Sequence, residues 1–365
     1  MNLTTNELIN LKYMMKVISI TTWLMLLILA GCSDASPYAE EPSAQERTIT
    51  LNLDITTRAE AGEEESPDNF HLWIFNGDKL LTYINSNPSW EEVNNGKVDL
   101  KATVEAEIDA TEVNAIQFYL LLNTNVTGPW GMTPANLKNL TFTLPDQPYS
   151  HDNKVPMSGE ATLDIFPSQI HYDVRIDAVR SVAKLGIYCT KGNTSPFSTL
   201  TINQVTLSKV PDKGYLFEPD PDSYTSIKYT GTKNLLSITE QITVTKYYTG
   251  KMPSYSEDSW AETTTEESFE EISSPYLLEN LNRNVTDDGF LQVNGSITDD
   301  DKRYCITLIY TLNGVGYTQN IYVSRVERNQ YSKIYIRIND AITVDDIYCQ
   351  VNSWTEHEID VPAFE

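Results

Sequence analysis

The sequence predicts an all-β protein, and three observations lead to that prediction. Apolar and polar residues alternate with period two along most of the chain, as in TITLNLDI at 48–55, and this period places successive side chains on opposite faces of a strand. Short strand-like runs, such as AIQFYLLLN at 115–123 and KIYIRI at 333–338, are separated by Gly, Pro, Asn and Asp, which favour turns. No long amphipathic helix pattern interrupts these runs. We therefore expect packed β-sandwiches.

The first predicted strand has one clearly apolar face. Its inward-facing residues are Ile49, Leu51, Leu53 and Ile55, and its polar residues are Thr48, Thr50, Asn52 and Asp54. A second strand follows at 69–75, and Asn76-Gly77 then marks a hairpin that leads into KLLTYI at 79–84.

The length of 365 residues predicts two domains, because single cores usually divide beyond about 250 residues. The stretch Phe166-Pro167-Ser168-Gln169 separates ATLDI from the long predicted strand IHYDVRIDAVRSVAKLGIY. We expect an N-terminal domain at 59–168 and a C-terminal domain at 169–365.

Charge and composition exclude several classes of protein. Asp and Glu total 51 against 26 Lys and Arg, so the net charge is −25. Nucleic-acid binding is disfavoured, because a basic surface supplies most of its affinity. Only 4 His and 4 Cys are present, too few for a zinc array or a disulfide scaffold. Cys189, Cys305 and Cys349 each lie in an apolar strand-like run and are expected to be buried thiols, with a disulfide between two of them left open.

The amino terminus has the features of an export signal. Residues 17–30 form an apolar run after Lys12 and Lys16, and this run is shorter than the roughly 20 residues that a membrane span needs. It ends in Leu29-Ala30-Gly31-Cys32, which resembles a bacterial lipobox. This interpretation makes 1–31 a lipoprotein signal peptide and Cys32 the lipidated first residue at the outer membrane. A secretory signal with a chance cysteine is the alternative.

Motifs for catalysis or metal binding are missing from the sequence. His71, His151, His171 and His357 have no partners at metal-ligand spacing, and no nucleophile elbow or phosphate loop occurs. We therefore predict no enzyme, no catalytic residue, no metal and no cofactor. A glycosidase carboxylate pair is left open and ranks last among the alternatives.

Two weaker binding patterns are weighed against simpler explanations. The segment 218–222, Glu-Pro-Asp-Pro-Asp, could supply oxygens to calcium, but it lacks the spacing and glycine of an EF-hand loop. Trp90 and Trp130 could stack on sugars, although aromatic residues in β-sandwiches more often belong to the core.

Several strings occur together in one order along the chain. They are FYLLLN at 118–123, VPMSGE at 155–160, VRSVAKLGI at 179–187 and VERNQYSKIYIRI at 326–338. With the lipobox, they resemble the fimbrillin family of Bacteroidales, the type V pilins. The resemblance implies two tandem transthyretin-like β-sandwich domains in a subunit of an adhesive surface fimbrium.

The resemblance also implies how such a subunit would assemble. An arginine-specific protease would cut between Arg58 and Ala59, removing 32–58 together with the displaced strand that carries Ile49, Leu51, Leu53 and Ile55. A strand from the tail 355–365 of another copy would then fill the groove. The expected donor residues of that tail are His357, Ile359, Val361 and Ala363. Head-to-tail repetition gives a homopolymer, with a host or bacterial surface receptor as a further partner.

Alternatives remain at each of these steps. TITLNLDI could be an ordinary edge strand, and cleavage at Arg47 would remove the lipid without opening a groove. An anchor subunit would keep its lipid and first strand, whereas a tip subunit would need no free tail. A surface glycan-binding lipoprotein is the alternative from another class.

Overall fold

The computed structural model describes 47–58, 67–94, 98–110, 113–146, 149–150, 153–192, 198–250, 267–281, 302–323, 326–339 and 346–353. Its contacts place the described residues from Thr48 onward in one compact unit. Almost all of the regular structure is β-strand, as the sequence predicted. None of the helices in these ranges is long and apolar enough to cross a membrane.

The amino-terminal part of the unit is an eight-stranded sheet in the order β3-β2-β6-β8-β9-β1-β5-β4. Its strands are β1 (Thr48–Arg58), β2 (Phe70–Asn76), β3 (Lys79–Ile84), β4 (Glu91–Asn94), β5 (Val98–Asp109), β6 (Ala115–Leu122), β8 (Met157–Asp164) and β9 (His171–Arg180). β8 and β9 pair only at Met157–Arg180 and Ser158–Val179. Apolar residues from β1 and β9 pack in one core with residues from β2 and β6. The two halves of the sheet therefore enclose a sandwich core.

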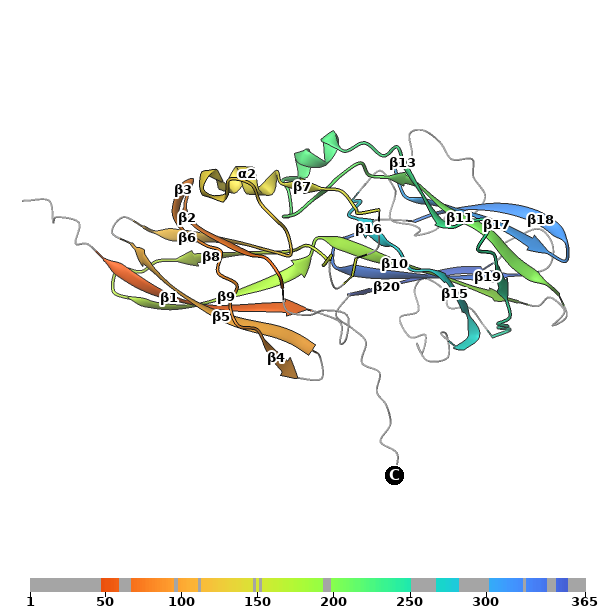
Figure 1. Ribbon diagram of the computed structural model, residues 1–365, viewed down its shortest axis with the longest axis horizontal. Helices are drawn as coiled ribbons and strands as arrows, with labels where there is room; N and C mark the ends of the chain where they lie inside the picture. Colours follow the sequence, from red (N-terminus) through yellow and green to blue (C-terminus); the bar gives the residue numbers. More distant parts are fainter. Residues whose placement is uncertain are drawn as a thin grey trace, which may run out of the picture. The chain divides into compact units, whose positions relative to one another are not determined.

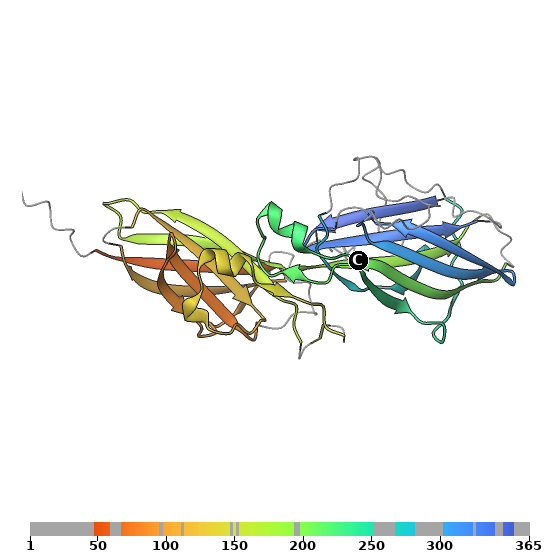
Figure 2. The same cartoon turned by 90° about the horizontal axis from the view of Figure 1, so that it is seen from above.

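β1 lies in the interior of this sheet. It is antiparallel to β5 from Thr48, opposite Asp109, to Arg58, opposite Asp99. On its other side it is parallel to β9 from Thr50 to Thr57. Figure 1 and Figure 2 show β1, in red-orange, running alongside both neighbours. The alternative of an ordinary edge strand is therefore wrong.

Two sheets enclose a second core. One has the order β15-β10-β19-β20 with β16 on β10, and the other β13-β11-β17-β18 with β14 on β11. Their strands are β10 (Val182–Lys191), β11 (Leu200–Val210), β13 (Gly231–Leu236), β14 (Ile242–Val244), β15 (Glu270–Ser273), β16 (Tyr276–Leu278), β17 (Cys305–Leu312), β18 (Val315–Tyr322), β19 (Gln330–Ile338) and β20 (Asp346–Ser353). Buried side chains from both sheets, such as Ile187, Leu207 and Ile334, form one apolar cluster.

Short elements connect these sheets. They are the 3-10 helices η1 (Pro129–Gly131) and η2 (Pro221–Ser226), the helix α2 (Pro134–Lys138), and the two-residue strands β7 (Thr141–Phe142) and β12 (Gly214–Tyr215), which pair with each other. Thr133 caps α2, because its hydroxyl accepts a hydrogen bond from the Asn136 N–H.

The change from the first core to the second falls at Ser181, later in the chain than the sequence suggested. A boundary between 168 and 169 would separate β9 from β1, to which it is hydrogen-bonded. The single long strand expected across this region is divided into β9 and β10. At the break, the Ser181 N–H donates to the Pro156 carbonyl over 2.8 Å. The buried apolar positions change parity at this break, from even numbers such as Ile176 in the first core to odd numbers such as Leu185 in the second.

Candidate functional site

The inner face of β1 is completely buried. Ile49, Leu51, Leu53 and Ile55 each have 0% of their surface exposed. They belong to the same apolar cluster as Phe118 on β6. At about 1.5–3 kcal/mol for each side chain, their burial contributes at most roughly 6–12 kcal/mol, an upper bound because the unfolded chain also buries some surface. This is comparable to the whole net stability of about 5–15 kcal/mol for a typical domain.

The outer face of β1 is polar and contacts both neighbouring strands. Asp54 forms an ion pair with Lys101 Nζ over 3.1 Å and accepts a hydrogen bond from Thr103 Oγ1 over 3.2 Å, and both partners lie on β5. On β9, Asp173 accepts a hydrogen bond from Asn52 Nδ2 over 3.0 Å. The Asp54 and Lys101 side chains are about 40% exposed, so these pairs fix the alignment more than they stabilise the fold.

The carboxyl end of β1 carries the arginine predicted as the cleavage site. Arg58 is the last residue of the strand. Thr57, directly before it, is 1% exposed, and its hydroxyl has no hydrogen-bond partner among the described residues. A buried hydroxyl in that state costs about 1–3 kcal/mol. Arg47, the alternative cleavage site, directly precedes the strand.

Several predicted site residues lie outside the described ranges. They are the lipidation site Cys32, the new amino terminus Ala59, and the donor residues His357, Ile359, Val361 and Ala363. Their roles stay predictions.

A second polar centre, around Arg328, was not predicted as a site from the sequence. The Arg328 guanidinium forms an ion pair with Glu279 over 2.9 Å, and their side chains are only 10% and 7% exposed. It also donates to the carbonyl oxygens of Tyr215, Leu216 and Phe217 at 3.0–3.2 Å. Arg328 thereby holds three consecutive carbonyls of one segment. The string VERNQYSKIYIRI contained this arginine, but no local pattern revealed its distant partners.

The segment that Arg328 holds is anchored in both parts of the unit. Leu216 and Phe217 pack in a cluster with Trp73 and Tyr119, and the Phe217 and Tyr119 rings meet edge to face at 5.6 Å. The Leu216 carbonyl also accepts bonds of 2.7 Å from Ser158 and of 2.7 Å from Ser181. We call Tyr215–Phe217 the hook segment.

Glu279 is held ionised by this arrangement. Burial alone would raise the pKa of Glu279, but the Arg328 charge and the hydrogen bonds from Arg328 and Tyr224 outweigh it and lower the pKa. The Tyr224 hydroxyl donates to Glu279 Oε2 over 2.6 Å. The same carboxylate, together with burial, raises the pKa of Tyr224.

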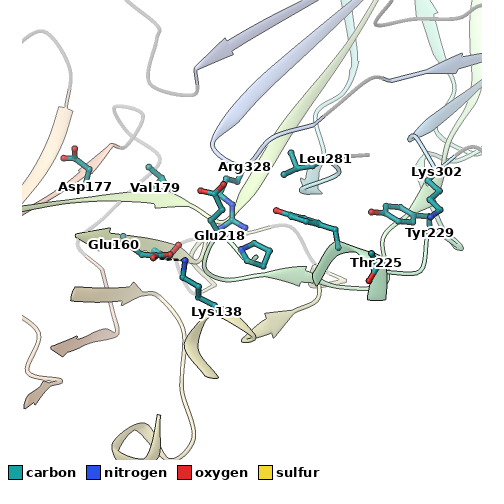
Figure 3. Close-up of a pocket in the computed structure, with 14 residues that line it drawn as sticks. Lys138, Glu160, Asp177, Val179, Glu218, Thr225, Tyr229, Leu281, Lys302 and Arg328 are labelled. Carbon is teal, nitrogen blue, oxygen red and sulfur yellow. Dashed lines mark ion pairs between the residues drawn. The ribbon is translucent and has the colours of Figure 1, made fainter. Parts of the chain in front are cut away.

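A cavity of about 670 Å³ lies beside Arg328 (Figure 3). Its lining contains cations and carboxylates in similar number, among them Lys138 and Glu160, which pair over 3.3 Å. Burial raises the pKa of Glu160 in spite of Lys138. Figure 3 shows Glu218 close to Arg328. Because charges of both signs line the cavity, its lining does not favour an anionic ligand over a cationic one.

Those of the remaining candidate residues that the structure describes are not grouped as metal ligands. The described ranges contain no group of three His, Cys, Asp or Glu placed to hold a metal, and this includes Glu218, Asp220 and Asp222. His71 Nδ1 lies 2.6 Å from the Tyr83 hydroxyl, and burial lowers the pKa of His71. Cys189 is a buried thiol whose pKa burial raises.

The two candidate sugar-stacking tryptophans differ in their surroundings. Trp130, on η1, is 68% exposed and meets Tyr83 edge to face at 4.9 Å. Trp90 instead packs partly against the first core. Trp130 is thus a single exposed ring, which is common on protein surfaces.

Comparison with known structures finds the same fold in a fimbrial protein. The tip fimbrial protein Mfa3 from Porphyromonas gingivalis aligns with a TM-score of 0.50 and 13% identity, over 83% of this chain and 98% of that one. A fimbrilin from Porphyromonas gingivalis aligns with a TM-score of 0.47 and 10% identity, over 85% and 98%. A fimbrial assembly protein from Parabacteroides distasonis has a TM-score of 0.43 and 9% identity, over 84% and 96%. No protein-family model and no curated protein sequence matches the chain. The resemblance predicted from the sequence is confirmed at the level of the fold.

Shortening an inward side chain of β1 should destabilise the protein strongly. Leu53→Ala is expected to lower the free energy of unfolding by about 2–5 kcal/mol, because it leaves a cavity in the core. Thr50→Ala, on the outer face of the same strand, should cost about 1 kcal/mol or less. Urea unfolding of both variants tests this. Equal losses would contradict the burial pattern.

Replacing Glu279 should make stability depend less on pH. Folding lowers the pKa of Glu279 from its ordinary value of 4.5. The contribution of the ionised Glu279 to the free energy of unfolding is therefore complete above pH 4.5 and is lost as the pH falls through the lowered pKa of the folded state. Glu279→Gln should lose about 3–5 kcal/mol at pH 7, since Arg328 stays buried without its partner. The difference from the wild type should shrink below about pH 4. Unfolding curves from pH 3 to 7 measure this, with the exposed Glu91→Gln as control. A constant difference across the range would contradict it.

Proposed function

We propose that this protein is a structural subunit of an adhesive surface fimbrium that polymerises by protease-triggered strand exchange. The observation that supports the proposal most is the position of β1: an interior strand with a fully buried apolar face that ends at Arg58. A strand with these properties is necessary for the first core. Cleavage of the single peptide bond that follows Arg58 would nevertheless separate this strand from the rest of the chain. The fimbrial proteins that share the fold are consistent with this role.

Loss of β1 would leave the sheet with a defined vacancy. Cleavage between Arg58 and Ala59 would free residues 32–58, and the backbone N–H and C=O groups that β5 and β9 direct at β1 would lose their partners. An extended strand of another subunit can satisfy both rows of groups, as in other cases of strand addition. We name this vacancy the β5–β9 groove.

In this proposal the occupant is the tail 355–365 of a second copy, with His357, Ile359, Val361 and Ala363 as the expected donor residues. The same groove and tail on each copy make the contact head to tail, and such a contact repeats into a filament. Before cleavage, the lipid on Cys32 would hold the subunit at the outer membrane. The mature subunit would be 59–365, with no enzymatic role and with a surface receptor as a further partner.

Two other functions remain as alternatives within the proposal. An anchor or tip subunit would retain β1 or lack a donated tail, and one protein that shares the fold is a fimbrial tip protein. A surface glycan-binding lipoprotein would keep the lipid on Cys32 and use an exposed ring such as Trp130.

Blocking cleavage at Arg58 should stop polymerisation. The wild-type chain, treated with an arginine-specific protease, is expected to begin at Ala59 and to form ladders on gels, because the open groove accepts a second copy. Arg58→Ala should keep β1 and stay monomeric, whereas Arg47→Ala should polymerise like the wild type. Amino-terminal sequencing and intact mass follow the cleavage. Ladders from Arg58→Ala, or a lipidated monomer from the wild type, would contradict the stalk role.

A further inference from the structure

One outer face of the second core is formed by side chains that carry no charge. β11, β17 and β18 lie side by side (Figure 1), and the pairing of their residues determines which side chains point away from the core. The outward positions are Thr201, Asn203, Gln204 and Thr206 on β11, Thr307, Ile309 and Thr311 on β17, Gly316, Thr318 and Asn320 on β18, Asn234 on β13 and Thr243 on β14. We call this set of residues the neutral face.

The neutral face differs from the other outward surface described above. Charged residues make up 21% of the chain, and the net charge is −25. The outward face around β1 follows this composition, because it carries Asp54, Lys101, Glu105, Asp173 and Arg175. High strand propensity explains the threonines of the neutral face, but it does not explain why charged residues occur on one sheet face and are missing from the other.

The neutral face is accessible. Thr318 is exposed, and a Cβ atom added at Gly316 would meet no atom within 4 Å. Ile309 belongs to none of the apolar clusters that the described residues form. At one end the face stops at Tyr322, where the Arg303 guanidinium lies over the ring at 4.7 Å from its centroid.

Side chains on the neutral face hold one another in place. Thr307 Oγ1 donates a hydrogen bond of 2.8 Å to Asn320 Oδ1, and Thr311 Oγ1 donates one of 2.8 Å to Asn203 Oδ1. Threonine is also stiff about χ1 because it is branched at Cβ. A donating hydroxyl keeps its lone pairs, and an amide that accepts through oxygen keeps its N–H groups. The face therefore presents ordered donors and acceptors, which reduces the entropy lost on binding.

The missing charge favours an uncharged polar ligand. Burying a hydroxyl or an amide in a contact costs much less than burying an ion, provided that it finds a hydrogen-bond partner. A charged ligand finds no counter-charge among the outward positions, and the net charge of −25 repels an anion before contact. Sugar hydroxyls are uncharged, and they both donate and accept hydrogen bonds. The threonine methyl groups and Ile309 can contact the C–H groups of a sugar ring.

A second copy of this chain fits the neutral face less well. β17 and β18 have eight residues each. With about 3.4 Å per residue and about 4.8 Å per strand, three such strands cover about 400 Å². A stable protein–protein interface buries about 800 Å² on each partner. Two copies would also bring a net charge of −25 each to the contact.

We propose that the neutral face binds an uncharged carbohydrate, as a neutral polysaccharide chain lying on β11, β17 and β18. This inference rests on the proposed function, in which it gives the surface receptor a chemical class. The face is separate from the other candidate sugar contact, Trp130, which lies on η1 and meets Tyr83 on β3. It is also complete in a single chain, so binding needs neither cleavage at Arg58 nor polymerisation.

Charge substitutions on the neutral face test the proposal. The full chain, not treated with protease, is run on native gels that contain dextran, mannan or galactomannan, with polygalacturonate as the anionic probe. Retardation relative to a gel without polysaccharide gives the affinity. The variants are Thr318→Glu and Thr318→Gln, which differ in charge and hardly in size. Thr162→Glu, at an exposed position of β8, controls for the added charge.

We expect a neutral polysaccharide to retard the wild-type chain and polygalacturonate to leave it unretarded. Thr318→Glu should weaken binding at least about tenfold, because its carboxylate would lose water in the contact. Thr318→Gln and Thr162→Glu should stay within about twofold of the wild type, since neither places a charge in the contact. Thermal unfolding verifies that all variants are folded.

Three results would overturn the proposal. They are the lack of retardation by all three neutral polysaccharides, retardation that Thr318→Glu leaves unchanged, and self-association in sedimentation velocity that Thr318→Glu removes, which would make a second copy the occupant. None of these results affects strand exchange, which the Arg58→Ala experiment tests separately. If the chain binds a neutral polysaccharide but forms no polymer after cleavage, the stalk role fails and the glycan-binding alternative takes its place.

Discussion

The first core depends on β1, because β5 and β9 pair with β1 and not with each other. β5 and β9 both use their backbone groups to pair with β1, and they have no pairing with each other in the sheet order. Four fully buried aliphatic side chains on β1 supply apolar contact to the opposite half of the sheet. Backbone pairing and side-chain burial therefore coincide in a single segment of eleven residues. Its removal would leave room for one strand between β5 and β9, which stand two strand spacings of about 4.8 Å apart.

The Arg328 centre performs a complementary task at the hook segment. A buried ion pair by itself adds little to stability, because desolvation offsets the attraction. Here the guanidinium also donates to three consecutive backbone carbonyls of the hook segment. Asn329 follows with φ of 56°, a left-handed conformation that asparagine adopts more readily than most residues. The pair Arg328-Asn329 thus has a structural explanation: one residue binds the hook, and the next turns the chain into β19.

Local alternation was sufficient to predict the strands and the buried face of β1, because burial on one side of a strand leaves a period of two in the sequence. The interior position of β1 could not be predicted, since it depends on parallel pairing with β9, far along the chain. The partners of Arg328 were hidden for the same reason: Glu279 and the hook segment are 49 and about 112 residues away. The division at Ser181 did leave a signal, because the buried positions shift from even to odd residue numbers within VRSVA at 179–183, but a shift of one residue is easily read as one continuous strand.

The pairing of β1 with β9 also has a consequence for the order in which the molecule is built. Asn52 bonds to Asp173, a partner 121 residues later in the chain. Folds dominated by such distant contacts form slowly, because a long loop must close before any contact rewards it. During synthesis β1 can pair with β5 early, but it must wait until 171–180 has been made before its sheet can close. Until then the aliphatic face of β1 is an aggregation-prone surface, so the interval between the synthesis of β1 and that of β9 is the period in which the chain is most exposed to misassembly.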